Sequence, residues 1–463
     1  MADILKDKTH KALISMSLPI SIGMLSTFLF QVIDTYFVGQ LGAESLAALS
    51  FSSTIYFLLI SIFIGLSVGV SIIIGKSAGE KDAEKIKKTT LIAIIVSLVL
   101  SIALVSLVLL FVEDIFQGLG ADDKTIPYIT AYMIPLLLGV PLLNTSLLCG
   151  GILRATGNIV KPEALMGVAG VLNLVFDYLL IFGKWGFPEL GIKGAAYATV
   201  LSWIFLIVGM LFLLVQDRLL SFSLKAKTST KLIIAEIFKL GAPTILTQVI
   251  IPLTLIFLTF LLAKQSFTAV AAFGVAGRIE VLLMIGIFGV SSSITPFIAQ
   301  NSGAEKPERI DEAIVFGGRA STFLGLFVAL LLFCFIKPIA TIFSDHEEVI
   351  GYTVTYFHLV GLSYIFYGLF LVTTSIFSGL QLPINSLKIS AVKLLLFTMP
   401  LTLIGSIWGV GGIFTGFALS NVLAGIYAAN QIQKELKRTN SALADVTLLQ
   451  AYKNDIMLLF GKR

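Results

Sequence analysis

Residues Phe51–Gly75 read FSSTIYFLLISIFIGLSVGVSIIIG and contain no charged side chain. An α-helix needs about 20 mainly apolar residues to cross the hydrocarbon core of a bilayer, so this stretch is long enough to span it. Eleven further apolar stretches follow the same pattern, with short polar segments between them. The twelve stretches begin near Leu13, Phe51, Thr89, Pro127, Glu163, Gly194, Gly241, Ala271, Phe316, Ile350, Ile389 and Gly412. The sequence therefore predicts an all-α membrane protein with twelve transmembrane helices.

The composition of the whole chain agrees with this prediction. Of the 463 residues, 57% are hydrophobic and 13% are charged, and that charged share is about half of the share in soluble domains. The net charge of +5 is small for the length, and the basic residues lie between apolar runs, which argues against a nucleic-acid partner. No GxxxxGK(S/T) motif, HExxH motif or cluster of His and Cys ligands occurs. We therefore expect neither an enzyme nor ATP-driven transport, and no cofactor.

Lysine and arginine residues indicate the orientation of a membrane protein, because they are enriched in cytoplasmic loops. With the N-terminus in the cytoplasm, 26 of the 32 basic residues fall in cytoplasmic segments, five fall outside, and Arg278 lies within a span. The cytoplasmic count includes Lys388 and Lys393, in the segment that leads into the eleventh span. We expect a multi-pass protein of the cell inner (plasma) membrane with both termini in the cytoplasm.

An internal repeat relates the two halves of the chain. Pro19 in LPISIGMLSTF corresponds to Pro243 in APTILTQVIIP, and the same displacement along the chain leads from Gly65 to Gly289. Six spans in each half give the two halves the same orientation, as in the parallel repeats of several secondary transporters. The alternative is a duplicated bundle that transports nothing.

The longest polar interruption divides the chain into its predicted parts. It runs from Gln216 to Lys239 and carries five basic residues. The predicted parts are an N-terminal lobe with helices 1–6 (1–215), a cytoplasmic linker (216–240), a C-terminal lobe with helices 7–12 (241–432) and a cytoplasmic tail (433–463).

Acidic residues within predicted spans are the first functional candidates, because an ionisable group costs a few kcal/mol at the centre of a bilayer. Asp34 lies in FLFQVIDTYFVG of the first span, fifteen residues after Pro19. Asp177 lies in GVLNLVFDYLLIFG of the fifth span, and Asn173 precedes it by one helical turn on the same face. These groups offer either oxygen ligands for a hard cation or a protonatable carboxylate with an amide partner.

The repeat indicates where this chemistry belongs. Its displacement leads from Asp34 to Leu258 and from Asp177 to Leu401, so the second half has no matching acids. We therefore expect the coupling cation to bind in the first half. The alternatives are that Asp34 is merely solvated near the outer interface and that Asp177 has a purely structural hydrogen-bonding role.

Three further ionisable residues lie within predicted spans of the second half. Arg278 and Glu280 are two residues apart in the eighth span, so they do not face each other on an ideal helix. They could pair with other helices in a structural or a functional role. His358 in the tenth span could carry a proton, but we predict a satisfied core histidine.

The ordered set of motifs resembles one known family. The matching pieces are LPI and QVIDTYFVGQLG at the first span, GKSAGEKD after the second, LRATGN at Leu153–Asn158, NLVFDYLLIFG in the fifth and GIKGAAYAT before the sixth. They resemble the multidrug and toxic compound extrusion (MATE) family of cation-coupled efflux transporters, over about Lys11–Gln431. The resemblance implies two six-helix lobes in a V shape around a cavity with alternating access, in which substrate leaves as H⁺ or Na⁺ enters.

The resemblance also implies roles for individual residues. Asp34 and Asp177 match the acidic positions of the family's cation site in the N-terminal lobe. Asn173 matches the amide of that site, and Thr199 in GIKGAAYAT matches its hydroxyl. If Na⁺ is the coupling ion, these four residues are its expected ligands. Pro19 is the expected conformational hinge, since a proline removes one backbone hydrogen bond and lets a helix bend.

One departure from the family indicates a branch. NorM-type members carry acids in the seventh and tenth spans, whereas GAPTILTQVIIPLTLIFL and YTVTYFHLVGLSYIFYG contain none here. The chain thus resembles the DinF-like branch. We assign the substrate cavity to Gln31, Tyr36, Asn144 and Arg278.

These observations together predict a multidrug efflux secondary transporter. It would export amphipathic, often cationic compounds in exchange for H⁺ or Na⁺, with small lipophilic molecules and the bilayer as its partners, and would work as a monomer. One alternative is a flippase for a lipid-linked substrate of the same wider superfamily, which would need a more cationic cavity. Another is an integral-membrane lipid enzyme, for which no nucleophile or metal constellation is visible.

Overall fold

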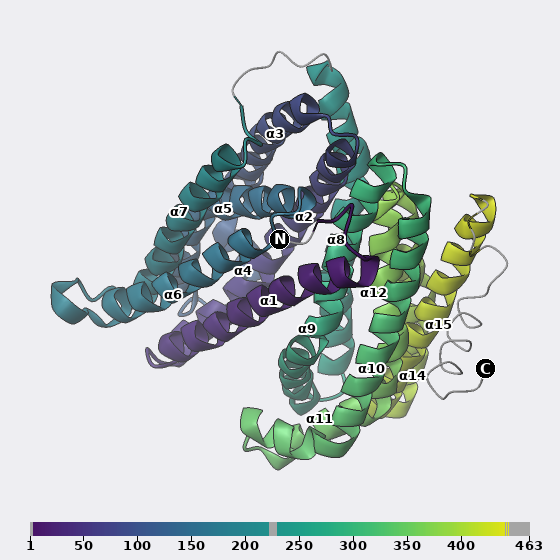
Figure 1. Cartoon of the computed structure of the whole chain (residues 1–463). Helices are drawn as coiled ribbons and strands as arrows, with labels where there is room; N and C mark the ends of the chain where they lie inside the picture. The colour runs from purple at the N-terminus through teal and green to yellow at the C-terminus, as the bar shows by residue number, and fades with distance from the viewer. Residues whose placement is uncertain (1–2, 222–228, 440, 442, 444–463) are drawn as a thin grey trace. The chain divides into compact units, whose positions relative to one another are not determined.

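The computed structural model describes residues 3–221, 229–439, 441 and 443 (Figure 1). Part of the predicted linker and most of the predicted tail, residues 222–228 and 444–463, lie outside the described residues. All regular secondary structure in the described part is helical. The α-helices are α1 (Thr9–Gly39), α2 (Ala43–Gly79), α3 (Ala83–Leu110), α4 (Val112–Gly118), α5 (Ile126–Ala155), α6 (Val160–Phe182), α7 (Ile192–Gln216), α8 (Thr230–Ala263), α9 (Phe267–Gly303), α10 (Pro307–Phe343), α11 (Glu347–Val360), α12 (Tyr364–Gly379), α13 (Pro383–Val392), α14 (Met399–Gly405) and α15 (Gly409–Arg438).

Eleven helical segments of the described chain are long and apolar enough to cross a membrane. The last segment, Pro383–Arg438, has 56 residues, which is more than twice the length that one crossing needs. Its direction changes at Gly409, where φ is 75° and α15 begins. This segment therefore contains the eleventh and twelfth predicted spans, and the prediction of an all-α, twelve-helix membrane protein is confirmed. The sequence did not predict the short helix α4.

The described contacts divide the chain into two compact units. Unit 1 consists of Ile22–Ile245, and unit 2 consists of the segment that ends at Ser21 and the chain from Leu246 onward. Each unit has its own apolar core, which includes Phe63 in unit 1 and Phe414 in unit 2. Both boundaries fall within helices, α1 and α8, rather than in loops.

Two glycines related by the repeat explain these boundaries. A Cβ on Gly65 of α2 would lie 2.6 Å from the backbone nitrogen of Ile245, so α8 packs directly on that glycine in unit 1. A Cβ on Gly289 of α9 would lie 2.8 Å from the carbonyl oxygen of Ser17, so the first part of α1 packs in the same way in unit 2. Helices approach this closely only where a side chain is absent.

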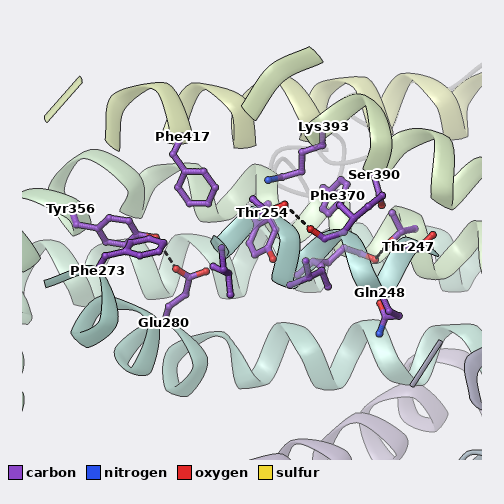
Figure 2. Close-up of a pocket in the computed structure, with 16 residues that line it drawn as sticks. Thr247, Gln248, Thr254, Phe273, Glu280, Tyr356, Phe370, Ser390, Lys393 and Phe417 are labelled. Carbon is purple, nitrogen blue, oxygen red and sulfur yellow. Dashed lines mark hydrogen bonds between the residues drawn. The ribbon is translucent and has the colours of Figure 1, made fainter. Parts of the chain in front are cut away.

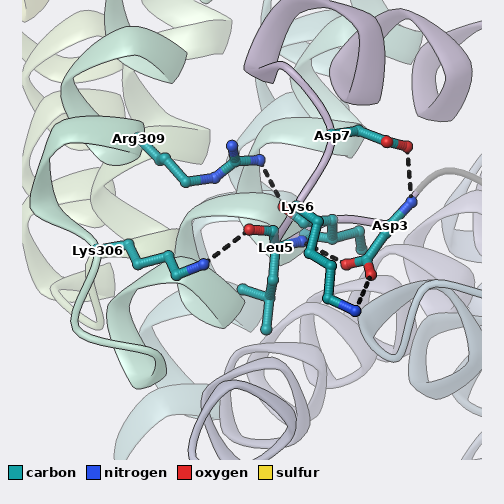
Figure 3. Close-up of polar contacts among 7 residues, drawn as sticks. Asp3, Leu5, Lys6, Asp7, Lys306 and Arg309 are labelled. Carbon is teal, nitrogen blue, oxygen red and sulfur yellow. Dashed lines mark hydrogen bonds and ion pairs between the residues drawn. The ribbon is translucent and has the colours of Figure 1, made fainter.

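Polar contacts of the N-terminal segment also belong to unit 2 (Figure 3). Lys306 Nζ donates to the carbonyl oxygen of Leu5 at 2.8 Å, and Arg309 Nη2 donates to the carbonyl oxygen of Ile4 at 2.8 Å. Lys6 forms an ion pair with Asp3 at 3.4 Å. The sequence predicts that this segment and the start of α10 lie on the same side of the membrane, and their contact agrees with that.

The repeat recurs in individual hydrogen bonds. Ser67 Oγ donates to the carbonyl oxygen of Leu147 at 3.1 Å in unit 1, and Ser291 Oγ donates to that of Leu371 at 3.2 Å in unit 2. Ser291 is the repeat counterpart of Ser67, and Leu371 is the repeat counterpart of Leu147. One turn further along, the pairs Ser71–Gly151 and Thr295–Ser375 make the same contact. The backbone repeats too, because Lys81 and Glu305 adopt φ values of 60° and 54° at matching turns.

Candidate functional site

Two carboxyl groups face each other inside unit 1. Asp34 lies on α1 and Asp177 on α6, and their side chains are within hydrogen-bonding reach of each other. Asp177 is completely buried, and neither of its carboxyl oxygens has a hydrogen-bond partner by geometric criteria among the described residues. The same holds for one oxygen of Asp34. Two adjacent acceptors without a donor are a favourable arrangement only when they share a proton or a cation.

Glycines let α1 and α6 approach each other closely enough for this contact. A Cβ on Gly170, two turns before the aspartate of α6, would lie 2.8 Å from Cγ of Phe30 on α1. A Cβ on Gly23 of α1 would lie 3.2 Å from Cδ of Glu163, in the first turn of α6. Small residues serve this purpose in many pairs of membrane helices. The two aspartates meet because the helices that carry them are this close.

The other two predicted members of the cation site form a pair of their own. Asn173 of α6 donates from Nδ2 to Oγ1 of Thr199 on α7 at 3.3 Å, and Thr199 donates to the carbonyl oxygen of Ala195 at 3.0 Å. Asn173 lies one turn before Asp177, on the same face of α6. The structure thus brings the four predicted residues to α6 and its two neighbouring helices as two adjacent pairs.

Aromatic side chains lie around the aspartates. Tyr56 of α2 and Tyr132 of α5 are near enough to Asp34 for its charge to act on them. Tyr56 also stacks on Trp203 of α7, with ring centroids 6.1 Å apart and ring planes 1° from parallel. The carboxyl groups therefore lie in a largely apolar environment, where interactions between charges are stronger than in water.

The LRATGN motif has a structural role near the same helices. Arg154 at the end of α5 forms an ion pair with Glu163 of α6 at 2.8 Å, and Glu163 is 7% exposed. Asn158 donates to a carboxylate oxygen of Asp217, which also pairs with Lys161 at 3.4 Å. These contacts join the ends of α5, α6 and α7.

The residues predicted to line a substrate cavity have different surroundings. Gln31 and Tyr36 are exposed on α1, and Asn144 is completely buried and donates to Ser101 Oγ of α3 at 3.0 Å. Arg278 is exposed on α9 and belongs to unit 2. Pro19 lies inside α1, two residues before the boundary between the units.

Unit 2 contains a pocket that the sequence did not predict (Figure 2). Its cavity volume is about 90 Å³, and the empty space in and around it, which includes open solvent, is about 660 Å³. Glu280 of α9 lies in it and accepts hydrogen bonds from Tyr356 at 2.8 Å and from Tyr364 at 3.0 Å. Both hydroxyls donate to the same oxygen, Oε2. The partners of Glu280 therefore come from α11 and α12.

Lys393 extends into the same pocket from the other side (Figure 2). Its ammonium lies over the rings of Tyr367, Phe370 and Phe417, 5.2–5.6 Å from their centroids. The side chain is 7% exposed. The prediction that Lys393 lies in a cytoplasmic segment was wrong, because the lysine is enclosed by membrane-spanning helices.

The prediction for His358 was also wrong. Its side chain is exposed on α11 and packs against Phe333 of α10, which is itself exposed, with ring centroids 5.7 Å apart. It is therefore not a core histidine. Periodicity shows which residues share a helix face but not which face the bundle covers.

The sequence profile of the MatE family matches residues 19–179 and 243–404. The chain belongs to the MATE family. The two matched segments begin at Pro19 and Pro243, the pair of prolines that marks the internal repeat. Members of this family are ion-coupled transporters, so the chain is a membrane transporter and not an enzyme.

Individual relatives cover most of the chain. The FAD transporter of Shewanella oneidensis is 34% identical over 439 residues, which cover 93% of this chain and 96% of that protein. The probable multidrug resistance protein YoeA of Bacillus subtilis is 27% identical over 69% of this chain and 70% of its own length. Among solved structures, the MATE transporter VcmN of Vibrio cholerae in its bent form is 27% identical, with a TM-score of 0.87, over 93% of this chain and 98% of that chain.

Proposed function

We propose that this MATE transporter exports its substrate in exchange for protons and that the Asp34–Asp177 pair binds the coupling proton. The observation that carries the proposal is the contact between two carboxyl groups in which three oxygens, one of Asp34 and both of Asp177, lack donors. A shared proton would supply the missing donor and remove the repulsion between two negative charges. Losing that proton would restore the repulsion and favour a different arrangement of α1 and α6.

The hydrogen bonding of the site supports H⁺ rather than Na⁺. A hard cation needs several oxygen ligands, so Na⁺ would require the oxygens of Asn173 and Thr199 in addition to the carboxylates. Asn173 and Thr199 are bonded to each other and have no hydrogen bond to the carboxyl groups in the described structure, whereas the two carboxyl groups meet directly, as sharing a proton requires. The absence of acids from the seventh and tenth predicted spans supports assignment to the DinF-like branch.

The proposed substrate is FAD or a similar planar aromatic anion. Its support is the FAD transporter of S. oneidensis, which matches this chain over nearly the whole length of both proteins. Export of lipophilic, often cationic drugs is the second candidate. It is supported by YoeA and by the multidrug export protein MepA of Staphylococcus saprophyticus, which is 25% identical over 79% of this chain.

The proposal includes a hinge and an orientation. Pro19 would allow α1 to bend close to the position where the helix leaves unit 2, because a proline has no N–H to donate. Both termini would lie in the cytoplasm and the protein would lie in the plasma membrane, since 26 basic residues fall in the segments assigned to that side. Each monomer would work by itself.

Transport into liposomes tests the proposal. Purified protein would be reconstituted with FAD on one side, and H⁺ and Na⁺ gradients would be imposed separately. We expect FAD movement under the H⁺ gradient, its loss in Asp34→Asn and Asp177→Asn, and normal transport in Asp123→Asn, which changes an exposed aspartate. Transport driven by Na⁺ alone would overturn proton coupling.

A second set of transport measurements distinguishes between the two candidate substrates. Tetraphenylphosphonium would replace FAD as a lipophilic cation under the same gradients. Transport of the cation but not of FAD would favour the multidrug function. If well-folded protein moved neither compound, the flippase alternative would be favoured instead.

A further inference from the structure

The pocket of unit 2 contains a buried cation at an irregular point of the backbone. Lys393 is the first residue of a π-helical segment, Lys393–Thr398, between α13 and α14. Pro400 follows this segment and has no N–H to donate to the carbonyl of Leu396, which disfavours regular α-helical bonding there. Short π-helical segments are frequent at functional sites.

The surroundings of Lys393 leave its hydrogen-bonding capacity unused. An ammonium has three N–H donors, yet no carboxylate among the described residues lies within ion-pair distance of Nζ and no hydrogen bond from it is formed there. Its contacts are the faces of three aromatic rings. Burial of unsatisfied donors on a charged group is costly, so a ligand that supplied acceptors would be bound strongly.

The carboxylate on the other side of the pocket already forms hydrogen bonds. Oε2 of Glu280 already accepts hydrogen bonds from Tyr356 and Tyr364. The charge of Glu280 acts on Lys393 without a direct contact between the two groups. The ammonium of Lys393 therefore has all its donors unused, whereas one of the two oxygens of Glu280 already accepts two hydrogen bonds, and this asymmetry favours an anionic ligand over a cationic one.

The aromatic residues beside Lys393 include two nearly parallel rings. The rings of Tyr367 and Phe370 are stacked neighbours on α12, with centroids 5.9 Å apart and planes 12° from parallel. Both line the pocket, and Phe417 of α15 lines it from another helix. A planar ring system in the pocket can contact these rings and gain dispersion and stacking energy.

We propose that this pocket binds the exported substrate and that it selects a planar aromatic ring system carrying an acidic group. The ring would lie against Tyr367 and Phe370, and the acidic oxygens would accept hydrogen bonds from Lys393. Glu280, fixed by its two tyrosines, would stay out of contact with the acidic group and repel a ligand placed the wrong way round. This binding site rests on the proposed function in one respect: the molecule that binds in the pocket is taken to be the molecule that is transported.

Equilibrium binding to the purified full-length protein, with no gradient present, tests the site. The probes are FMN and riboflavin, which share one ring system and differ by one phosphate, and fluorescence anisotropy measures their affinities. We expect FMN to bind at least about tenfold more tightly than riboflavin, because a charge-assisted hydrogen bond distinguishes them. Lys393→Gln should weaken FMN binding about tenfold or more and leave riboflavin within about twofold, whereas Lys393→Arg should keep the preference for FMN.

Two controls separate the site from general effects. Lys388→Gln removes an exposed lysine from the neighbouring helix α13 and should change neither affinity. Phe370→Leu should weaken both probes together, because it removes one of the two parallel rings that contact the shared ring system. Equal losses for FMN and riboflavin in Lys393→Gln would overturn the anion contact. A second pair of results would also overturn the anion contact: tetraphenylphosphonium binds tightly and Glu280→Gln abolishes that binding, while Lys393→Gln leaves FMN binding unchanged.

The same measurements distinguish this inference from the proposed function. Asp177→Asn should bind FMN normally but fail to move FAD under a gradient. If Lys393→Gln binds normally while Asp177→Asn loses transport, the site is wrong and proton coupling stands. If Lys393→Gln loses FMN binding while Asp177→Asn still transports, the site stands and the coupling proposal is wrong.

Discussion

A single proton shared by Asp34 and Asp177 limits how strongly a pH gradient can concentrate the substrate. Three oxygens of the facing carboxyl groups lack a donor, and a single proton shared between the two groups removes their mutual repulsion. One proton per cycle provides about 1.4 kcal/mol per pH unit, which corresponds to about a tenfold concentration ratio. With the membrane potential held at zero, a gradient of two pH units should concentrate the substrate about 100-fold at most.

The steady-state FAD ratio across liposome membranes measures this limit. Equal potassium concentrations and valinomycin would hold the potential at zero, so that the charge of the substrate does not contribute. Asp34→Asn and Asp177→Asn should each give a ratio of about one, because an amide cannot take up and release the proton. Asp123→Asn, an exposed position, should reach the full ratio.

Two outcomes would contradict the reasoning in different ways. A ratio of about 10,000 at two pH units would require two protons per cycle, and the shared proton would then be wrong. A ratio well above one in Asp177→Asn would mean that the coupling proton binds elsewhere in the chain.

Two further predictions concern stability, and thermal unfolding in detergent checks both. Arg154→Ala should destabilise the protein by about 3–5 kcal/mol, because it leaves the buried Glu163 without its ionic partner. Adding Glu163→Gln to that variant should recover much of the lost stability. Equal losses in the single and double variants would show that the buried charge is not the cause. Gly65→Ala should cost about 1–3 kcal/mol, since its Cβ would overlap the backbone of Ile245. Gly167→Ala is the matched control, because its Cβ would have no atom within 4 Å, and a similar loss there would exclude close packing as the reason.

The sequence predicts the fold and the acidic pair for the same physical reason. Water is absent from the membrane core, so spans must be long, apolar and helical, and a charge within one is conspicuous. Asp34 and Asp177 could be identified in this way although they lie on different helices. Their direct contact could not, because it depends on the close approach of α1 to α6 at Gly170.

The pocket of unit 2 shows where sequence reasoning reaches its limit. Glu280 is satisfied by tyrosines 76 and 84 residues further along the chain, and nothing in the local pattern connects these positions. Lys393 follows a polar stretch that contains Lys388, so the charge rule assigned both lysines to one loop. The apolar run that begins near Ile389 was the available signal, since it already encloses Lys393.

The positions at which α1 and α8 change units have a consequence for how the halves depend on each other. The boundaries after Ser21 and Ile245 are themselves related by the repeat, so the first part of the first helix of each half belongs to the compact unit of the other half. A fragment that ended at the linker would therefore keep its first helix but lack the segment of α8 that packs on Gly65. The exchange is reciprocal, as in a domain-swapped dimer, but it takes place within one polypeptide.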